Sequence, residues 1–285
     1  PLSDQSIDRP KWFYRIVLVL VARMQRWFLR MRIGVDMAEL RSVTITGCGL
    51  LNPAGIGLEG LGQVLGGTVP NFRARNFIAD RKSLKLMTKG VQLGVSAIQL
   101  ALDDDGDWSD VPPERRGLFV GASPQPGDPD ALVPALEASI GPDGFDMGRY
   151  ASEGYPLIHP LWLVRGLSNN IIGFASAIHD LQGVNMNYCD GVSGGWNALR
   201  EGALAVAEGR ADLVVAGGAD AWSGAEELLG GAACADGAGF VVFRPGTPDV
   251  LSDLKKDPGV DEREALGFMG AATGPVAFCR RWMQR

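Results

Sequence analysis

The sequence is poor in the side chains that most often carry catalysis or hold metal ions. It contains only two histidines, His159 and His179, and four cysteines, with no Cys-x-x-Cys pair and no zinc-finger spacing among them. These numbers leave little room for a metal site or for a histidine-dependent triad. Scattered cysteines suit a reducing compartment better than a disulfide framework. We therefore expect no metal and no cofactor, and we interpret both histidines as structural.

Long apolar runs are also lacking in the N-terminal segment. Its longest uninterrupted run is residues 16–22, which is seven residues, whereas a membrane-spanning helix needs roughly 20. No small-residue cleavage site follows this run, and arginines come directly after it, so a signal peptide fits poorly. The segment 11–33 instead mixes aromatic and basic residues, which is typical of a basic amphipathic helix.

Three interpretations of this N-terminal helix stay open. It could lie on an anionic membrane surface, dock into the groove of a partner, or cover an apolar patch on its own domain. The residues that we expect to make the membrane or partner contact are Trp12, Phe13, Arg23, Arg26, Trp27, Phe28 and Arg30.

The charge is unevenly placed along the chain. The net charge is −6, but residues 1–41 hold eight Lys/Arg against four Asp/Glu, a net of +4, which leaves −10 on residues 42–285. An acidic body argues against nucleic-acid binding. We divide the chain into a basic extension, residues 1–40, and one domain, residues 41–285, which is long enough to bury a sizeable core.

Residues 183–221 contain the most informative pattern. The segment 184–188 alternates apolar residues with asparagines, as a strand does. Glycines at 191, 194 and 195 mark a sharp turn, residues 196–209 predict a helix, and the apolar run 212–216 predicts a buried strand. Strand, tight turn, helix and strand make a βαβ unit, and its turn is where such folds place a reactive or binding group.

This pattern resembles the nucleophile region of β-ketoacyl synthases. That family reads roughly G-P-N-x-T-x-x-T-A-C-A-S-G and, beyond a helix, G-x-A-D-x-x-x-A-G-G-A-E-A. Counting forward from Gly183 and back from Gly209 places Val192 where the family has its catalytic cysteine. Valine has no thiol and cannot form the acyl thioester. Cys189 lies three residues upstream, and we expect it to be a buried apolar cysteine on the strand.

Other segments extend the resemblance over residues 41–245. The segments 41–49, 51–61, 159–170 and 234–244 resemble successive motifs of the same family. The second half is shortened: the sequence has no H-G-T-G-T, and residues 266–275 resemble I-G-H-T-x-G-A-A-G with Phe268 where the histidine should stand. The resemblance implies an α/β, thiolase-like fold, mainly the N-terminal βαβ half with a shortened C-terminal half.

Five strands are expected in one central sheet. Short apolar or alternating runs between glycine turns predict them at 42–48, 117–121, 184–189, 212–216 and 239–243. Residues 87–102 predict a helix, followed by an acidic cluster, 103–105, that we interpret as a solvated loop. His179 is expected in the middle of a helix. The Gly-, Pro- and Asp-rich residues 124–156 predict a long excursion over the surface.

Three functions follow from the resemblance. The first is a non-catalytic subunit, similar to a chain-length factor, that pairs with an active synthase in fatty-acid, polyene or polyketide synthesis. The second is a structural subunit of a larger, membrane-associated complex. The third is a residual decarboxylase that uses backbone donors at 191–195. The first function implies a cytoplasmic protein, or one attached to the inner face of the membrane. Such a subunit would meet acyl carrier protein through its partner.

The resemblance also places the partner contact. It implies pairing through the strand beside the turn, and we expect the isolated chain to be unstable as a monomer, because the shortened second half leaves apolar surface uncovered. The expected interface residues are Gly183, Val184, Asn185, Met186, Asn187, Tyr188 and Cys189.

Overall fold

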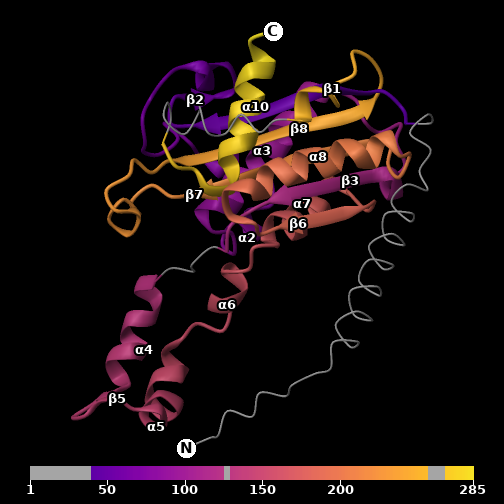
Figure 1. Cartoon of the computed structure of the whole chain (residues 1–285). Helices are drawn as coiled ribbons and strands as arrows, with labels where there is room; N and C mark the ends of the chain where they lie inside the picture. Colours follow the sequence, from indigo (N-terminus) through magenta and orange to yellow (C-terminus); the bar gives the residue numbers. More distant parts are fainter. Residues whose placement is uncertain (1–39, 125–128, 256–266) are drawn as a thin grey trace, which may run out of the picture. The chain divides into compact units, whose positions relative to one another are not determined.

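A six-stranded mixed sheet lies at the centre of the protein, in the strand order β2-β1-β8-β7-β3-β6 (Figure 1). The computed structural model describes residues 40–124, 129–255 and 267–285. The strands are β1 (Val43–Asn52), β2 (Gly55–Ile56), β3 (Arg116–Gly121), β6 (Asn185–Tyr188), β7 (Leu213–Ala221) and β8 (Asp236–Pro245). All five predicted strands are present in this one sheet, so the prediction is confirmed, and β1, β7 and β8 run longer than expected.

The pairing leaves β6 at one edge of the sheet. β3 runs parallel to β6 on one side and to β7 on the other, and β8 is antiparallel to both β7 and β1. β7 and β8 are buried almost throughout, as expected for strands covered on both faces.

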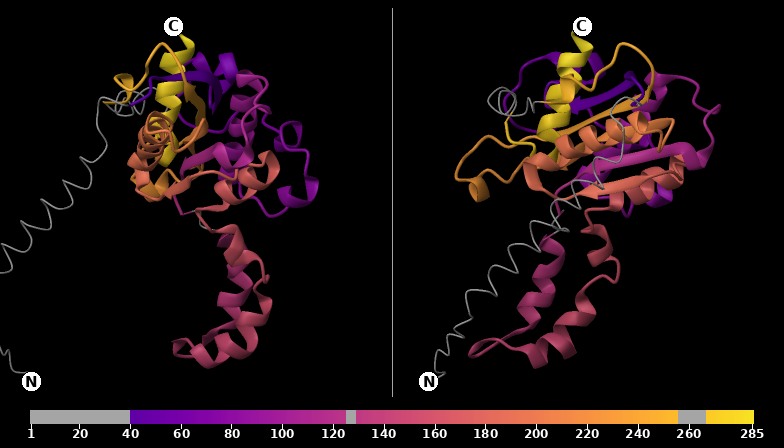
Figure 2. Two further views of the ribbon diagram at one scale, coloured as in Figure 1. Left: turned by 90° about the vertical axis from the view of Figure 1, so that its right-hand side faces the viewer. Right: turned by 45° about the vertical axis from the view of Figure 1, so that its right-hand side comes forward.

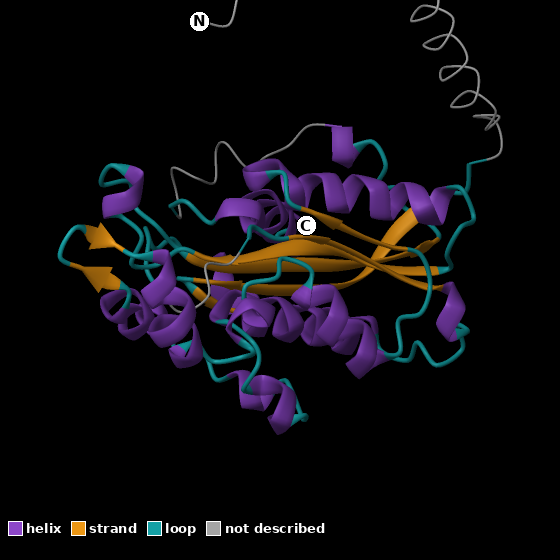
Figure 3. Cartoon of the chain, turned by 90° about the horizontal axis from the view of Figure 1, so that it is seen from below, coloured by secondary structure: helices purple, strands orange, loops and turns teal. Residues whose placement is uncertain are grey.

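Helices cover both faces of the sheet, which Figure 3 shows edge on. α3 (Lys89–Asp105) and α7 (Asn170–His179) share one face, and α8 (Gly194–Ala207) and α10 (Thr273–Met283) share the other. Adjacent residues of β1 show the alternation: a Cβ on Gly49 would lie 2.0 Å from the Ala97 carbonyl oxygen of α3, whereas the Cys48 thiol contacts Cys279 of α10. Gly49 therefore lets α3 approach the sheet backbone directly.

The remaining elements are short. They are α2 (Arg81–Leu84), α4 (Val133–Ala138), α5 (Met147–Arg149), α6 (Trp162–Arg165), the two-stranded hairpin β4 (Ile140–Gly141) and β5 (Gly144–Phe145), and single turns of helix that include η6 (Tyr150–Gly154), η7 (Tyr155–Leu157), η8 (Gly191–Ser193) and η11 (Gly270–Ala272).

The predicted surface excursion is present and is longer than expected. It continues past 156 to about 167, and its elements α4, α5, η6 and η7 pack chiefly on one another. Figure 2 shows these helices grouped together, apart from the helices that cover the sheet. We call residues 131–167 the arm.

The acidic cluster is not a solvated loop, so that interpretation was wrong. Residues 103–105 are the last turn of α3. Asp104 Oδ2 accepts the Cys48 backbone N–H at 2.9 Å, and the buried Asp105 carboxylate binds the Arg244 guanidinium at 2.7 Å. These carboxylates tie the end of α3 to β1 and β8. A carboxylate at a helix C-terminus can be buried in this way when an arginine lies opposite, as Arg244 does for Asp105.

His179 is the last residue of α7 and not a mid-helix residue as expected. Its imidazole is buried, and burial lowers its pKa from 6.5 to about 4, with the Asp103 carboxylate opposing the shift. The interpretation as a structural histidine fits this environment, because an imidazole whose pKa is about 4 is only a weak base at neutral pH.

We expect His179→Leu to remove part of the acid sensitivity of the fold. The folded-state pKa lies below the unfolded value, so the unfolded chain binds the proton more tightly, and stability is lost as pH falls from 6.5 towards 4. A shift of this size corresponds to about 3 kcal/mol. Urea unfolding at pH 7.5 and pH 4.5 measures it, with the exposed His159→Ala as control. If the wild type and His179→Leu lose equal stability on acidification, the prediction is wrong.

The N-terminal extension lies outside the described residues, and with it the contacts expected of Trp12, Phe13, Arg23, Arg26, Trp27, Phe28 and Arg30. Among the helices that the structure does describe, we find none with the length and apolarity that crossing a membrane requires.

Candidate functional site

The candidate site lies at the turn between β6 and α8, where the sequence predicts it. β6 ends at Tyr188, and the single turn η8 leads into α8. The one left-handed residue of this turn is Gly191, with φ of 60°. Val192 follows it and is half-buried. Neither glycine nor valine has a nucleophilic side chain, and Ser193 supplies the only hydroxyl of η8.

Glycines of β3, β7 and α8 hold this turn against the C-terminal segment. A Cβ on Gly121 would lie 2.1 Å from the Gly195 nitrogen, and a Cβ on Gly195 would lie 2.1 Å from the Ala271 carbonyl oxygen. A Cβ on Gly218 would lie 2.6 Å from that same oxygen. We call Gly121, Gly195 and Gly218 the glycine junction. Because these glycines have no side chains, the two motifs that the sequence analysis singled out come together there: the turn of 183–221 and the described part, 267–275, of 266–275.

Phe268 brings no reactive side chain to the glycine junction. Its ring packs edge-on against Trp222 with the centroids 5.1 Å apart, and its backbone forms a parallel bridge with Cys234. The structure therefore brings the turn and the η11 segment into contact, while the Phe268 side chain lies against the end of β7.

Asp220 is a central residue of the site that the sequence analysis did not single out. Its carboxylate is fully buried near the end of β7 and accepts the Ser123 N–H at 2.9 Å, the Ser123 hydroxyl at 2.7 Å and the Ala271 N–H at 2.7 Å. Burial raises the pKa of Asp220, while these hydrogen bonds and one from Trp222 act in the opposite direction. The sequence did carry a signal for Asp220, because it is an acidic residue within an otherwise apolar strand.

The chemistry that this arrangement offers is limited. Thioester formation needs a nucleophile, and stabilising an enolate or oxyanion needs donors that are free to bind it. At the turn, no thiol or imidazole is present on residues 190–195, and the donors of Ser123 and Ala271 are already occupied by Asp220. Within the described residues, no group of three or more His, Cys, Asp or Glu is placed to hold a metal ion.

Cys189 is exposed, so its interpretation as a buried apolar cysteine was wrong. Its thiol lies 3.0 Å from Ser168 Oγ and 3.1 Å from Asn187 Nδ2. The reason is its place in the sheet: it directly follows the last residue of an edge strand, so no neighbouring strand covers its outer side. Cys48, Cys234 and Cys279 are also free thiols and are buried.

The predicted interface segment, 183–189, lies at the edge of the sheet, where β3 is its one strand partner among the described residues. β6 covers 185–188, with Gly183 and Val184 leading into it and Cys189 following it. The Val184 and Tyr188 carbonyls accept N–H groups of β3 and its extension, Leu118 at 3.0 Å and Ala122 at 3.1 Å. In a parallel ladder the bonding residues alternate, so the backbone N–H and C=O groups of Asn185 and Asn187 point away from β3. Met186 is 50% exposed.

Comparison with known proteins places this architecture among ketosynthases. The sequence matches no protein-family model. A type II polyketide ketosynthase in complex with its acyl carrier protein shares the fold with a TM-score of 0.60 and 16% identity, over 75% of this chain and 65% of that one. The ishigamide ketosynthase/chain length factor matches with a TM-score of 0.58 and 18% identity, over 72% of this chain and 58% of that one. A β-ketoacyl synthase from Burkholderia phymatum matches with a TM-score of 0.56 and 19% identity, over 73% of this chain and 60% of that one.

The likeness is one of fold and is partial in length. The chain spans 58–65% of the three chains that it matches. At these identities the shared feature is the fold, and function has to be argued from the site itself. The chain therefore has a ketosynthase-like, thiolase-type fold.

Proposed function

We propose that this protein is a non-catalytic ketosynthase-like subunit that pairs with an active β-ketoacyl synthase, in fatty-acid, polyene or polyketide synthesis. One observation carries the proposal: within the described residues no strand pairs with the outer side of β6, and the turn beside it has no thiol on residues 190–195. A row of unpaired N–H and C=O groups is a template for a strand of another chain.

The loss of chemistry supports the same conclusion. Decarboxylative condensation needs a thiolate and donors for the developing negative charge. Here Val192 and Phe268 stand where the resemblance expects a cysteine and a histidine. Two of the solved structures that share the fold are described as a ketosynthase/chain length factor and as a ketosynthase with its acyl carrier protein. In our proposal the acyl carrier protein is reached through the partner subunit.

We expect no condensing activity from the purified chain. Incubation with acyl and malonyl thioesters of a carrier protein should yield neither a condensation product nor a covalent acyl adduct by mass spectrometry. Cys189→Ser serves as the control, because Cys189 is the exposed thiol nearest in sequence to the turn. An adduct on Cys189 in the wild type that disappears in this variant would overturn the proposal.

Proline at the β6 edge should weaken pairing. Asn185→Pro removes an N–H that points away from β3, so the fold keeps its own hydrogen bonds while the partner strand loses one. We expect at least a tenfold weaker association with a co-expressed synthase in sedimentation velocity. Asn185→Ala keeps the N–H and is the matched control. Equal affinity of both variants would exclude β6 as the pairing surface. The isolated wild-type chain should not stay a lone monomer at micromolar concentration but should self-associate.

A second candidate function rests on the extension. Residues 11–33 carry six Lys/Arg and no acidic residue, which favours a structural subunit of a larger, membrane-associated complex. Purification at native abundance separates the two proposals: recovery of a synthase and a carrier protein favours the first, and recovery of membrane-complex subunits favours the second.

A further inference from the structure

Among the described residues, the arm carries most of the large apolar side chains that are exposed. Of the 16 large apolar side chains that are exposed in the described residues, 11 lie between Val133 and Leu167. Single exposed apolar residues are normal on a soluble protein, but a concentration of them in a short segment marks an interaction surface. The rest of the described chain contributes only the other five.

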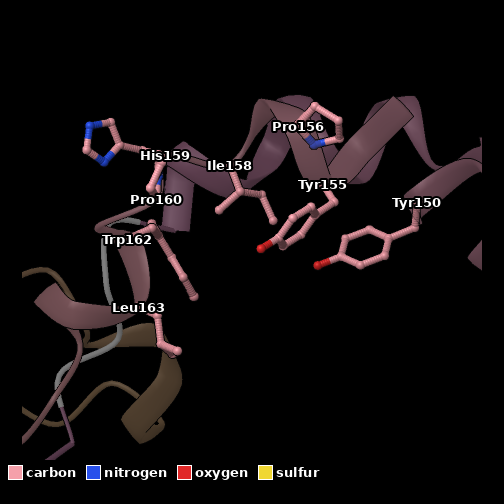
Figure 4. Close-up of a pocket in the computed structure, with 8 residues that line it drawn as sticks. All are labelled: Tyr150, Tyr155, Pro156, Ile158, His159, Pro160, Trp162 and Leu163. Carbon is pink, nitrogen blue, oxygen red and sulfur yellow. The ribbon is translucent and has the colours of Figure 1, made fainter. Parts of the chain in front are cut away.

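The arm also contains a pocket. It has a volume of about 470 Å³, within the range of ligand-sized pockets, and its lining includes Tyr150, Tyr155, Ile158 and Leu163 (Figure 4). The two tyrosine rings meet edge to face, with centroids 6.5 Å apart, and Figure 4 shows both hydroxyls directed to the same side. None of the eight lining residues is an aspartate, glutamate, lysine or arginine, so the pocket suits large apolar or aromatic side chains.

Around the apolar residues acidic side chains outnumber basic ones, by four to two. Glu137, Asp143, Asp146 and Glu153 are exposed, and the arm has no lysine. Its two arginines are half-buried, and Arg149 is occupied by the Ile140 carbonyl oxygen at 2.9 Å and by Glu153 at 3.2 Å. An anionic lipid surface or a nucleic acid would therefore meet like charge on the arm.

We propose that the arm is a docking site for an amphipathic helix of another polypeptide, with an apolar stripe flanked by lysine or arginine. The apolar side chains would enter the Tyr150–Tyr155 pocket, and the basic side chains would lie against the acidic ones, as in helix-in-groove recognition. A strand does not fit, because β4 and β5 are two residues each and offer almost no edge. This proposal does not depend on a synthase partner, since it uses neither β6 nor the turn.

The test uses the full-length chain and a fluorescein-labelled, 14-residue helical peptide of leucine and lysine. A peptide of the same pattern with glutamate in place of lysine is the charge control. By fluorescence anisotropy, we expect the leucine–lysine peptide to bind at least tenfold more tightly, with an affinity that falls as salt rises. Equal affinity of the two peptides, or no binding of the basic one, overturns the proposal.

Matched variants locate the binding. Leu163→Asp places a charge at the pocket and should weaken binding at least tenfold, whereas Leu228→Asp, at an 84% exposed position outside the arm, should not. The double variants Glu137→Gln/Asp143→Asn and Glu59→Gln/Glu227→Gln remove the same charge on and off the arm. Only the arm pair should lower the affinity, by at least threefold. Equal effects within either matched set show that the peptide binds elsewhere and overturn the proposal.

Discussion

Gly121→Ala is expected to destabilise the protein severely. The added Cβ would lie 2.1 Å from the Gly195 nitrogen and 2.3 Å from two neighbouring carbon atoms of the α8 backbone. A flexible side chain could move aside, but a helix backbone that is itself packed on Ala271 cannot. We expect a loss of at least about 3 kcal/mol in the free energy of unfolding, measured by urea denaturation.

Gly173→Ala is the matched control for this effect. Gly173 lies inside α7, and a Cβ there would meet nothing within 4 Å. Replacing an open helical glycine with alanine should stabilise the protein by about 0.5–1 kcal/mol. The pair therefore predicts changes of opposite sign for the same chemical substitution. A Gly121→Ala variant as stable as the wild type would mean that α8 can shift away from β3, and the turn would then not be held as described.

The site owes its position to this backbone contact. Gly121 ends β3, Gly218 lies in β7 and Gly195 lies in the first turn of α8. Their close approach fixes where the turn at Val192 stands relative to β6. A substitution in the glycine junction should therefore also alter the edge that we propose for pairing, whereas Gly173→Ala should leave pairing unchanged.

Most of the sheet could be predicted from the sequence because its signals are local. The runs that became β3, β7 and β8 are apolar, short and bounded by glycine turns, and burial on both faces requires that pattern. The alternation of Asn185, Met186 and Asn187 likewise predicted a strand, but burial along β6 does not alternate, since Asn185 and Met186 are both exposed.

The errors concern residues whose environment depends on distant partners. Asp105 is buried because Arg244, which lies 139 positions away, binds it. Cys189 is exposed because the sheet ends at β6, which no local pattern around that cysteine reveals. The glycine junction was invisible for the same reason: the sequence shows many glycines, and only the fold decides which of them meet.

Asp220 shows how the candidate site is held together without catalysis. Asp220 lies near the end of β7. Its carboxylate accepts hydrogen bonds from Ser123, in the segment after β3, and from Ala271, in the η11 turn. A buried carboxylate is costly unless donors surround it, and three donors lie within 2.9 Å here. The carboxylate therefore clamps three separate parts of the chain around the turn.

Asp220→Ala should lower the free energy of unfolding by about 4 kcal/mol, because it leaves two buried N–H groups and a hydroxyl without their acceptor. Asp220→Asn keeps one acceptor oxygen and should lose about half as much. Asp107→Ala is the control, an exposed carboxylate whose hydrogen bonds go to the nearby Ser109, and it should leave the unfolding midpoint nearly unchanged. Hydrogen exchange at the Ala271 amide adds a local readout, since this N–H loses its acceptor in Asp220→Ala. If the alanine variant keeps both its stability and the protection of that amide, the clamp does not hold η11 against the sheet, and the glycine junction alone supports the turn.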